Sequence, residues 1–258
     1  TYKTPNVYIE EIPVFPPSVA EVETAIPAFI GYTAKHEGRA GEDLLEKPTR
    51  IKSLADFERL FGGPHELEIK VEVTDTDGVK SIAVTKPDLK HNLHYAMRLF
   101  YANGGGPCYV VSVGTYKSNQ AIADSDLSKG LAAVKKEDEP TLLVVPEAIH
   151  LSAAKFTTLN EAMLAQCSEL KDRFAIFDTA VTDASESWGN RRKRYGADGL
   201  KYGAAYYPSI KTSMNFAVIK DDKGIAGENV KVKLPGGGAS AADKALTDPQ
   251  RVRVMTLQ

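Results

Sequence analysis

The sequence lacks the features that mark several large classes of proteins. Its 258 residues include only two cysteines, Cys108 and Cys167, which are far apart and in no CxxC pattern, so free thiols in a reducing compartment are expected. No apolar run approaches the roughly 18–20 residues of a membrane span, and no apolar signal region follows the N-terminus. The formal net charge is -2, whereas proteins that bind the phosphates of nucleic acids usually carry an excess of basic residues. We therefore expect a protein made in the cytoplasm without a signal peptide, with no direct membrane insertion and no nucleic-acid partner.

Motifs for catalysis and cofactor binding are also scarce. The glycines at 104–106 follow a predicted helix and precede a predicted strand, whereas a phosphate-binding loop follows a strand and opens a helix. His91 and His94 lie three apart on a predicted helix, three residues after Asp88, but no further ligand cluster accompanies them. Ordinary packing is the favoured interpretation, and we expect no metal and no cofactor.

One pair of carboxylates leaves an enzyme hypothesis open. Asp178 and Asp183 follow the apolar run RFAIF, at the edge of a parallel sheet where active sites often lie. Helix caps occupy the same positions in any α/β protein, and we favour that interpretation. The alternative is a parallel α/β enzyme with a site near Asp178 and Asp183.

Apolar runs alternate with helical periodicity along most of the chain. Continuous apolar strands separated by amphipathic helices indicate an α/β fold with a parallel-rich sheet, flanked by helices and covered on both faces. Strands are predicted over residues 25–34, 49–52, 108–113, 141–145, 173–177, 204–207 and 213–219, and helices over 54–61, 91–103, 121–136, 153–170 and 185–194.

A hairpin interrupts this alternation. Residues 66–85 alternate between apolar and polar on both sides of an Asp-Gly turn, which predicts an inserted β-hairpin over about 64–87. The Asp-x-Asp-Gly sequence resembles the start of a calcium loop, but Lys86 and Pro87 stand near the place of its later carboxylate. Residues 221–258 are rich in glycine and read as a loop-rich segment, with strand-like alternation at 251–257.

The N-terminal residues are predicted to be extended. A β-prone stretch is bounded by prolines, which fix φ and remove a donor. Such a segment is either a loosely packed terminus or an arm that adds a strand to another sheet edge; composition leaves both open. The candidate arm strand is Val7, Tyr8, Ile9 and Glu10, and the stiff linker contains Pro13, Pro16 and Pro17.

One basic run stands out. Arg191, Arg192, Lys193 and Arg194 are consecutive. The run suits a solvated face, a nucleic-acid module or a charge contact with an acidic patch on a neighbouring subunit.

Several segments together resemble contractile tail sheath proteins, the family found in phage tails and extracellular injection systems. The N-terminal part reads TPNVYIEEIPVFPPSVAEVETAIPAFIGYT, with Asn6 where the family usually has glycine. Further similar segments are SLADFERLFGG, MRLFYANGGGPCYVVSV, TLLVVPEA, RFAIFD and LKYGAAYYP. The resemblance covers about residues 4–208 and is greatest to the sheaths of extracellular injection particles.

The resemblance implies a structural, non-enzymatic subunit. Sheath subunits form sixfold rings stacked helically around an inner tube protein, link through extended arms, meet baseplate and cap proteins, and contract to drive the tube through a target envelope. It implies a division into an arm (1–20), an α/β sheath domain (21–220) and a segment (221–258) leading to a C-terminal domain. The family's C-terminal segments, which carry the tube contact and the acceptor of the arm, have no counterpart in this sequence.

Overall fold

The central element is a six-stranded mixed sheet. A computed structural model describes residues 25–65, 70–76, 79–85, 89–117, 121–179, 187–214, 220–221 and 224–225. The strand order is β2-β5-β1-β6-β7-β8, with β2 antiparallel to β5 and all other neighbours parallel. These strands are β1 (Pro27–Thr33), β2 (Thr49–Ile51), β5 (Cys108–Thr115), β6 (Leu142–Val144), β7 (Phe174–Asp178) and β8 (Gly203–Tyr206). The predicted α/β fold with a parallel-rich sheet is confirmed.

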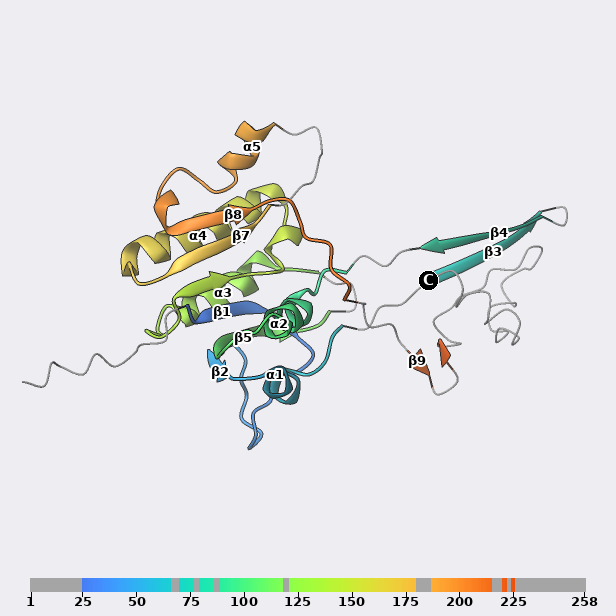
Figure 1. Cartoon of the computed structure of the whole chain (residues 1–258), viewed down its shortest axis with the longest axis horizontal. Coiled ribbons are helices and arrows are strands. Elements are labelled where there is room, and N and C mark those ends of the chain that lie inside the picture. Colours follow the sequence, from blue (N-terminus) through green and yellow to red (C-terminus); the bar gives the residue numbers. More distant parts are fainter. Residues whose placement is uncertain are drawn as a thin grey trace, which may run out of the picture.

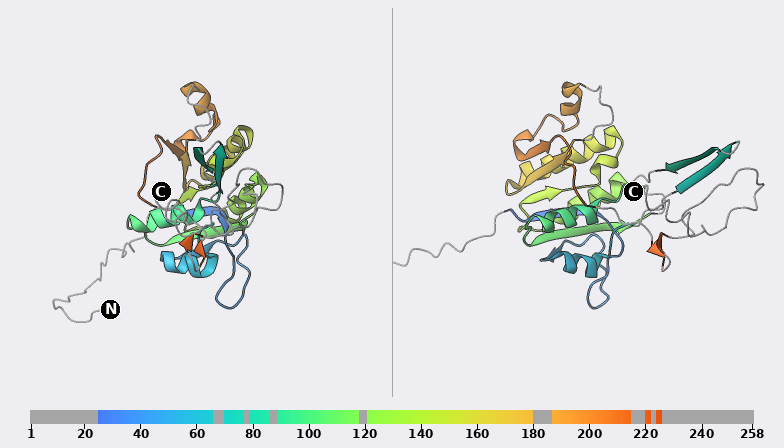
Figure 2. Two further views of the ribbon diagram at one scale, coloured as in Figure 1. Left: turned by 90° about the vertical axis from the view of Figure 1, so that its right-hand side faces the viewer. Right: turned by 45° about the vertical axis from the view of Figure 1, so that its right-hand side comes forward.

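Helices cover the two faces of the sheet unequally (Figures 1 and 2). On one face, α3 (Asp124–Val134) and α4 (Ala153–Leu170) pack against the whole width from β5 to β7. On the other face, α1 (Leu54–Phe61) and α2 (Leu93–Ala102) pack over β2, β5 and β1. Among the described residues, no helix packs on this second face over β6, β7 and β8, so within this part of the chain the expected helix cover of both faces is seen only over β2, β5 and β1.

Local sequence rules account for the elements. Helix α1 begins after Ser53, whose Oγ accepts from the Asp56 N–H at 3.1 Å, as its N-cap position predicts. The continuous apolar runs became the strands β1, β5, β6 and β7. Helix α2 begins at Leu93, two residues after the predicted start, and His91 before it is buried. Cys108 and Cys167 are free and buried.

The inserted hairpin is present as β3 (Lys70–Thr76) and β4 (Val79–Thr85), which pair antiparallel around the Asp-Gly turn position. In Figures 1 and 2 it stands apart from the six-stranded sheet. A short antiparallel pair, β9 (Lys220–Asp221) and β10 (Gly224–Ile225), follows later. Ser213 and Met214 are not in a strand, and the rest of that predicted strand, like residues 251–257, lies outside the described residues.

Candidate functional site: an uncovered apolar face of the sheet

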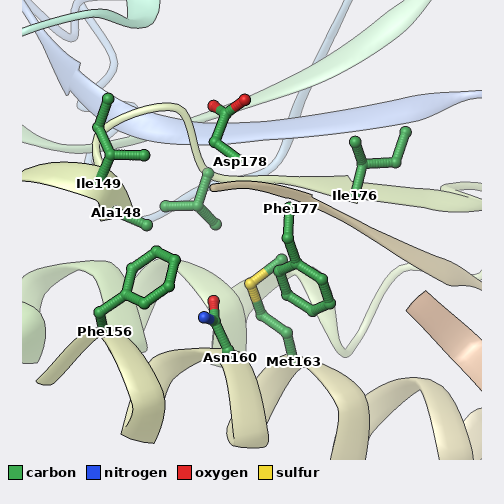
Figure 3. Close-up of a pocket in the computed structure, with 9 residues that line it drawn as sticks. Ala148, Ile149, Phe156, Asn160, Met163, Ile176, Phe177 and Asp178 are labelled. Atoms are coloured by element: carbon green, nitrogen blue, oxygen red, sulfur yellow. The ribbon is translucent and has the colours of Figure 1, made fainter. Parts of the chain in front are cut away.

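The sheet face that lacks a helix presents mostly apolar side chains in register. Alternation along β7 sends Ala175 and Phe177 toward α4, where both are buried, and sends Phe174 and Ile176 to the opposite face, where both are half-buried. Figure 3 shows this division directly: Phe177 points at α4, whereas Ile176 and Asp178 point away. Cross-strand neighbours continue the rows on the uncovered face: Pro27–Leu142–Phe174 and Phe29–Val144–Ile176–Ala204.

Part of this face forms a groove against α2. The groove has a volume of ≈ 830 Å³. Phe100 in its wall contacts Phe29 edge-on, with ring centroids 5.3 Å apart. Gly105 lets the loop after α2 close onto Phe100, because a Cβ there would lie 2.5 Å from that ring; the glycine run therefore helps to form the groove. The lining residues come from the chain entry (Ala25, Ile26, Pro27), the sheet (Phe29, Leu142, Val144, Ile176), α2 (Ala96, Leu99, Phe100) and the following loop (Asn103 to Pro107).

A second group of apolar side chains lies at the end of β8. Tyr206, Tyr207 and Ile210 are 64%, 52% and 84% exposed, and Trp188 is 58% exposed. Trp188 packs edge-on against Tyr207 with ring centroids 5.0 Å apart. Strand β8 is an edge strand of the sheet among the described residues. Exposed aromatic side chains beside a free strand edge are typical of protein–protein interaction sites.

The four residues of the basic run differ in how exposed they are. Helix α5 (Trp188–Lys193) buries Arg191, whose guanidinium lies 4.9 Å from the centre of the Trp188 ring. Arg192 and Lys193 are exposed and Arg194 is half-buried. The part of the run that can meet a partner in this structure is therefore Arg192 and Lys193, and a charge contact there stays a prediction.

The surroundings of Asp178 give no support to the enzyme alternative. The nearby cavity measures only ≈ 10 Å³ and is lined mainly by apolar side chains such as Phe156 and Met163 (Figure 3), which is about the space of one water. Asp178 is an exposed residue at the end of β7, and partial desolvation of its carboxyl raises its pKa, with no charged partner contributing. Asp183 lies outside the described residues.

The two helical histidines separate into different environments. His94 is buried with Nε2 3.2 Å from Glu58 Oε1. His91 is buried with Nδ1 3.7 Å from Oε1 of the buried Glu147. Asp88 lies outside the described residues, and within the described part of the chain no group of three or more His, Cys, Asp or Glu side chains could hold a metal ion.

Glu147 is a buried carboxylate that was not predicted from the sequence. It follows β6 at the carboxyl edge of the sheet and accepts the Tyr32 N–H at 2.9 Å. Burial raises its pKa, against the lowering by His91 and the Tyr32 and Leu93 N–H groups. Gly31 permits this approach, since a Cβ there would lie 3.1 Å from the carboxylate. The only sequence signal is a glutamate that follows the apolar run TLLVV after one proline.

An aromatic stack joins this cluster to the inserted hairpin. His91 lies after β4 and His65 lies before β3. Their rings are 5.2 Å apart, and the Tyr116 ring lies 5.2 Å from His65 and 5.0 Å from His91. Both ends of the insertion thus meet at the carboxyl ends of β1 and β5.

A second network of polar side chains lies at the same carboxyl edge of the sheet. The buried Tyr32 donates to Asp126 Oδ2 at 2.7 Å, and Lys117 Nζ lies 3.1 Å from the same oxygen. Burial raises the pKa of Asp126, but the Tyr32 and Lys117 hydrogen bonds outweigh it and hold that pKa below its usual value. The network ties β1 to the first turn of α3.

The predicted arm strand (Val7, Tyr8, Ile9, Glu10) and linker prolines (Pro13, Pro16, Pro17) lie outside the described residues. None of the described helices is long and apolar enough to cross a membrane.

No protein-family model matches the sequence, and no curated protein matches it.

The fold has a counterpart among solved structures. A chain in the cryo-EM structure of the anti-feeding prophage (AFP) baseplate in its contracted state is similar with a TM-score of 0.50 and 21% sequence identity. The similarity covers 88% of this chain and 51% of that chain, so this chain spans about half the length of its counterpart. At this identity the likeness concerns the fold.

Proposed function

We propose that this chain is a structural subunit of a contractile injection particle, and within it a subunit of the tail sheath. The observation that carries the proposal is the fold shared over 88% of the chain with a component of the AFP baseplate structure. It agrees with the sheath-like sequence segments, which come from the same part of the chain. In this role the protein forms sixfold rings around an inner tube, meets baseplate and cap proteins, and contracts.

The uncovered face supports a role in assembly. Parallel strands are normally covered on both faces, and a row of half-buried apolar side chains continuing to exposed aromatics is expected to be covered by protein. In a particle of repeated subunits, each such face has a neighbour available to cover it.

Negative-stain microscopy of the expressed full-length gene product tests the proposal. Tubes or rings are the expected result, whereas monomers that turn over a substrate would exclude it. Deleting residues 1–11, which removes the arm strand and keeps the linker, should leave the circular dichroism spectrum and melting temperature unchanged and abolish polymerisation, because the arm strand supplies main-chain hydrogen bonds to another subunit.

The matched control is a deletion of residues 1–4, which keeps Val7 to Glu10 and should polymerise normally. If the longer deletion unfolds the protein, the arm assignment is wrong. The double charge reversal Arg192→Glu with Lys193→Glu should shift the salt dependence of assembly, and an unchanged salt titration would remove the basic run from the interface.

A further inference from the structure

The groove beside α2 begins where the N-terminal segment enters the domain. Ala25, Ile26 and Pro27 are among its lining residues, so the N-terminal segment is joined to the domain at the groove. Ala25 has φ 72°, a left-handed conformation that alanine rarely adopts. Such a residue persists where the chain around it is held, and the next residue is held here, since the Ile26 N–H donates to Thr141 Oγ1 at 2.9 Å.

The composition of that segment matches the groove. The groove walls are apolar and include the rings of Phe29 and Phe100. Proline-rich segments bind aromatic-lined grooves at low entropic cost, because proline restricts the free chain in advance. Six consecutive residues near the entry carry no charge: Ile12, Pro13, Val14, Phe15, Pro16 and Pro17.

The segment is long enough to reach the groove within one molecule. Seven residues lie between Pro17 and Ala25, and the eight Cα–Cα steps that join the two span up to about 26 Å when extended. The groove crosses β1, β6 and β7, two strand spacings or about 10 Å.

We propose that residues 12–17 dock into this groove on their own domain, with Phe15 against Leu99, Phe100 and Ile176. The docked linker covers part of the open sheet face and fixes the point from which the strand Val7 to Glu10 leaves the domain. This consequence rests on the proposed function, because it matters only if the strand binds a neighbouring subunit. A strand that is already held in one direction loses less conformational entropy on binding. The docking itself is independent of any particle.

A disulfide-trapping experiment on the 258-residue chain tests the docking. The pair Phe15→Cys with Leu99→Cys should oxidise to an intramolecular link at a yield that does not depend on protein concentration. The control pair, Phe15→Cys with Ile210→Cys, should link on the order of tenfold less, because the effective concentration of a tethered group is high only where the tether holds it. Peptide mapping excludes the native thiols, which are buried.

Two outcomes would overturn the proposal. Equal yields in both pairs would show that Phe15 does not occupy the groove. Links between copies, increasing with protein concentration, would show that a second molecule fills it.

A second variant gives an independent reading. Leu99 is 38% exposed, so Leu99→Asp should leave the domain folded and expel Phe15. Cleavage after Glu11 by a glutamate-specific protease should then accelerate on the order of tenfold, because residues 12–15 must enter the protease cleft and can do so only from the open population. The control Ile210→Asp should not change it, and unchanged cleavage in Leu99→Asp would contradict the docking. Because both tests use the isolated chain, a failure to form particles leaves them valid, and a failure of docking leaves the proposed function standing.

Discussion

The two halves of the sheet differ in how they are covered. Every residue of β1 is buried, because α2 packs on one face and α3 on the other. In β7, only Ala175 and Phe177 are buried, on the α4 side. The strands of both halves are similarly apolar, yet among the described residues only the β1–β5 half is closed. Apolar strand composition therefore marks a face that must be covered, and the cover can come from outside the folded domain.

The largest expected effect comes from two phenylalanines on β7. Phe177→Ala should lower the free energy of unfolding by about 3–5 kcal/mol, because it opens a cavity against α4. Phe174→Ala, on the open face of the same strand, should cost less than about 1.5 kcal/mol, since its side chain is half-buried and loses only part of its transfer energy. Urea denaturation of both variants measures the difference; equal losses would mean that the open face is covered in solution.

The next largest effect on stability is expected from Asp126, in the polar network at the carboxyl edge of the sheet. The depressed pKa of Asp126 means that its ionised form stabilises the fold above the ordinary carboxyl pKa, and that this stability is lost as pH falls through the lower folded-state pKa. Asp126→Asn should therefore destabilise the protein by about 1–3 kcal/mol at pH 7 and by less in acid. Thermal melts from pH 7 to pH 2 measure this. A constant gap between the two proteins would refute the role of the charge.

The smallest effect on stability is expected at the exposed end of the open half. Tyr206→Asp should change the free energy of unfolding by less than about 0.5 kcal/mol, because the side chain is 64% exposed. If the aromatic group is an assembly surface, the same variant should reduce particle formation. Leu200→Asp, at another exposed apolar position, is the control. Normal assembly of Tyr206→Asp would place the interface elsewhere.

Sequence reasoning succeeded where one local rule decides the outcome. Continuous apolar runs located β1, β5, β6 and β7, and the Ser53 cap located α1. It failed where the answer depends on distant residues. The burial of His91 depends on Glu147 more than fifty residues later, and the uncovered face depends on where α2 stops covering the sheet. The groove could not be foreseen from the glycine run alone, because its function there is to let a loop approach Phe100.

The aromatic stack of His65, His91 and Tyr116 has a mechanical consequence. The hairpin projects from the body, but both of its ends are clamped at the carboxyl ends of β1 and β5, the most deeply buried strands of the sheet. If a force acts on the hairpin, these ring contacts are where it would reach the six-stranded sheet.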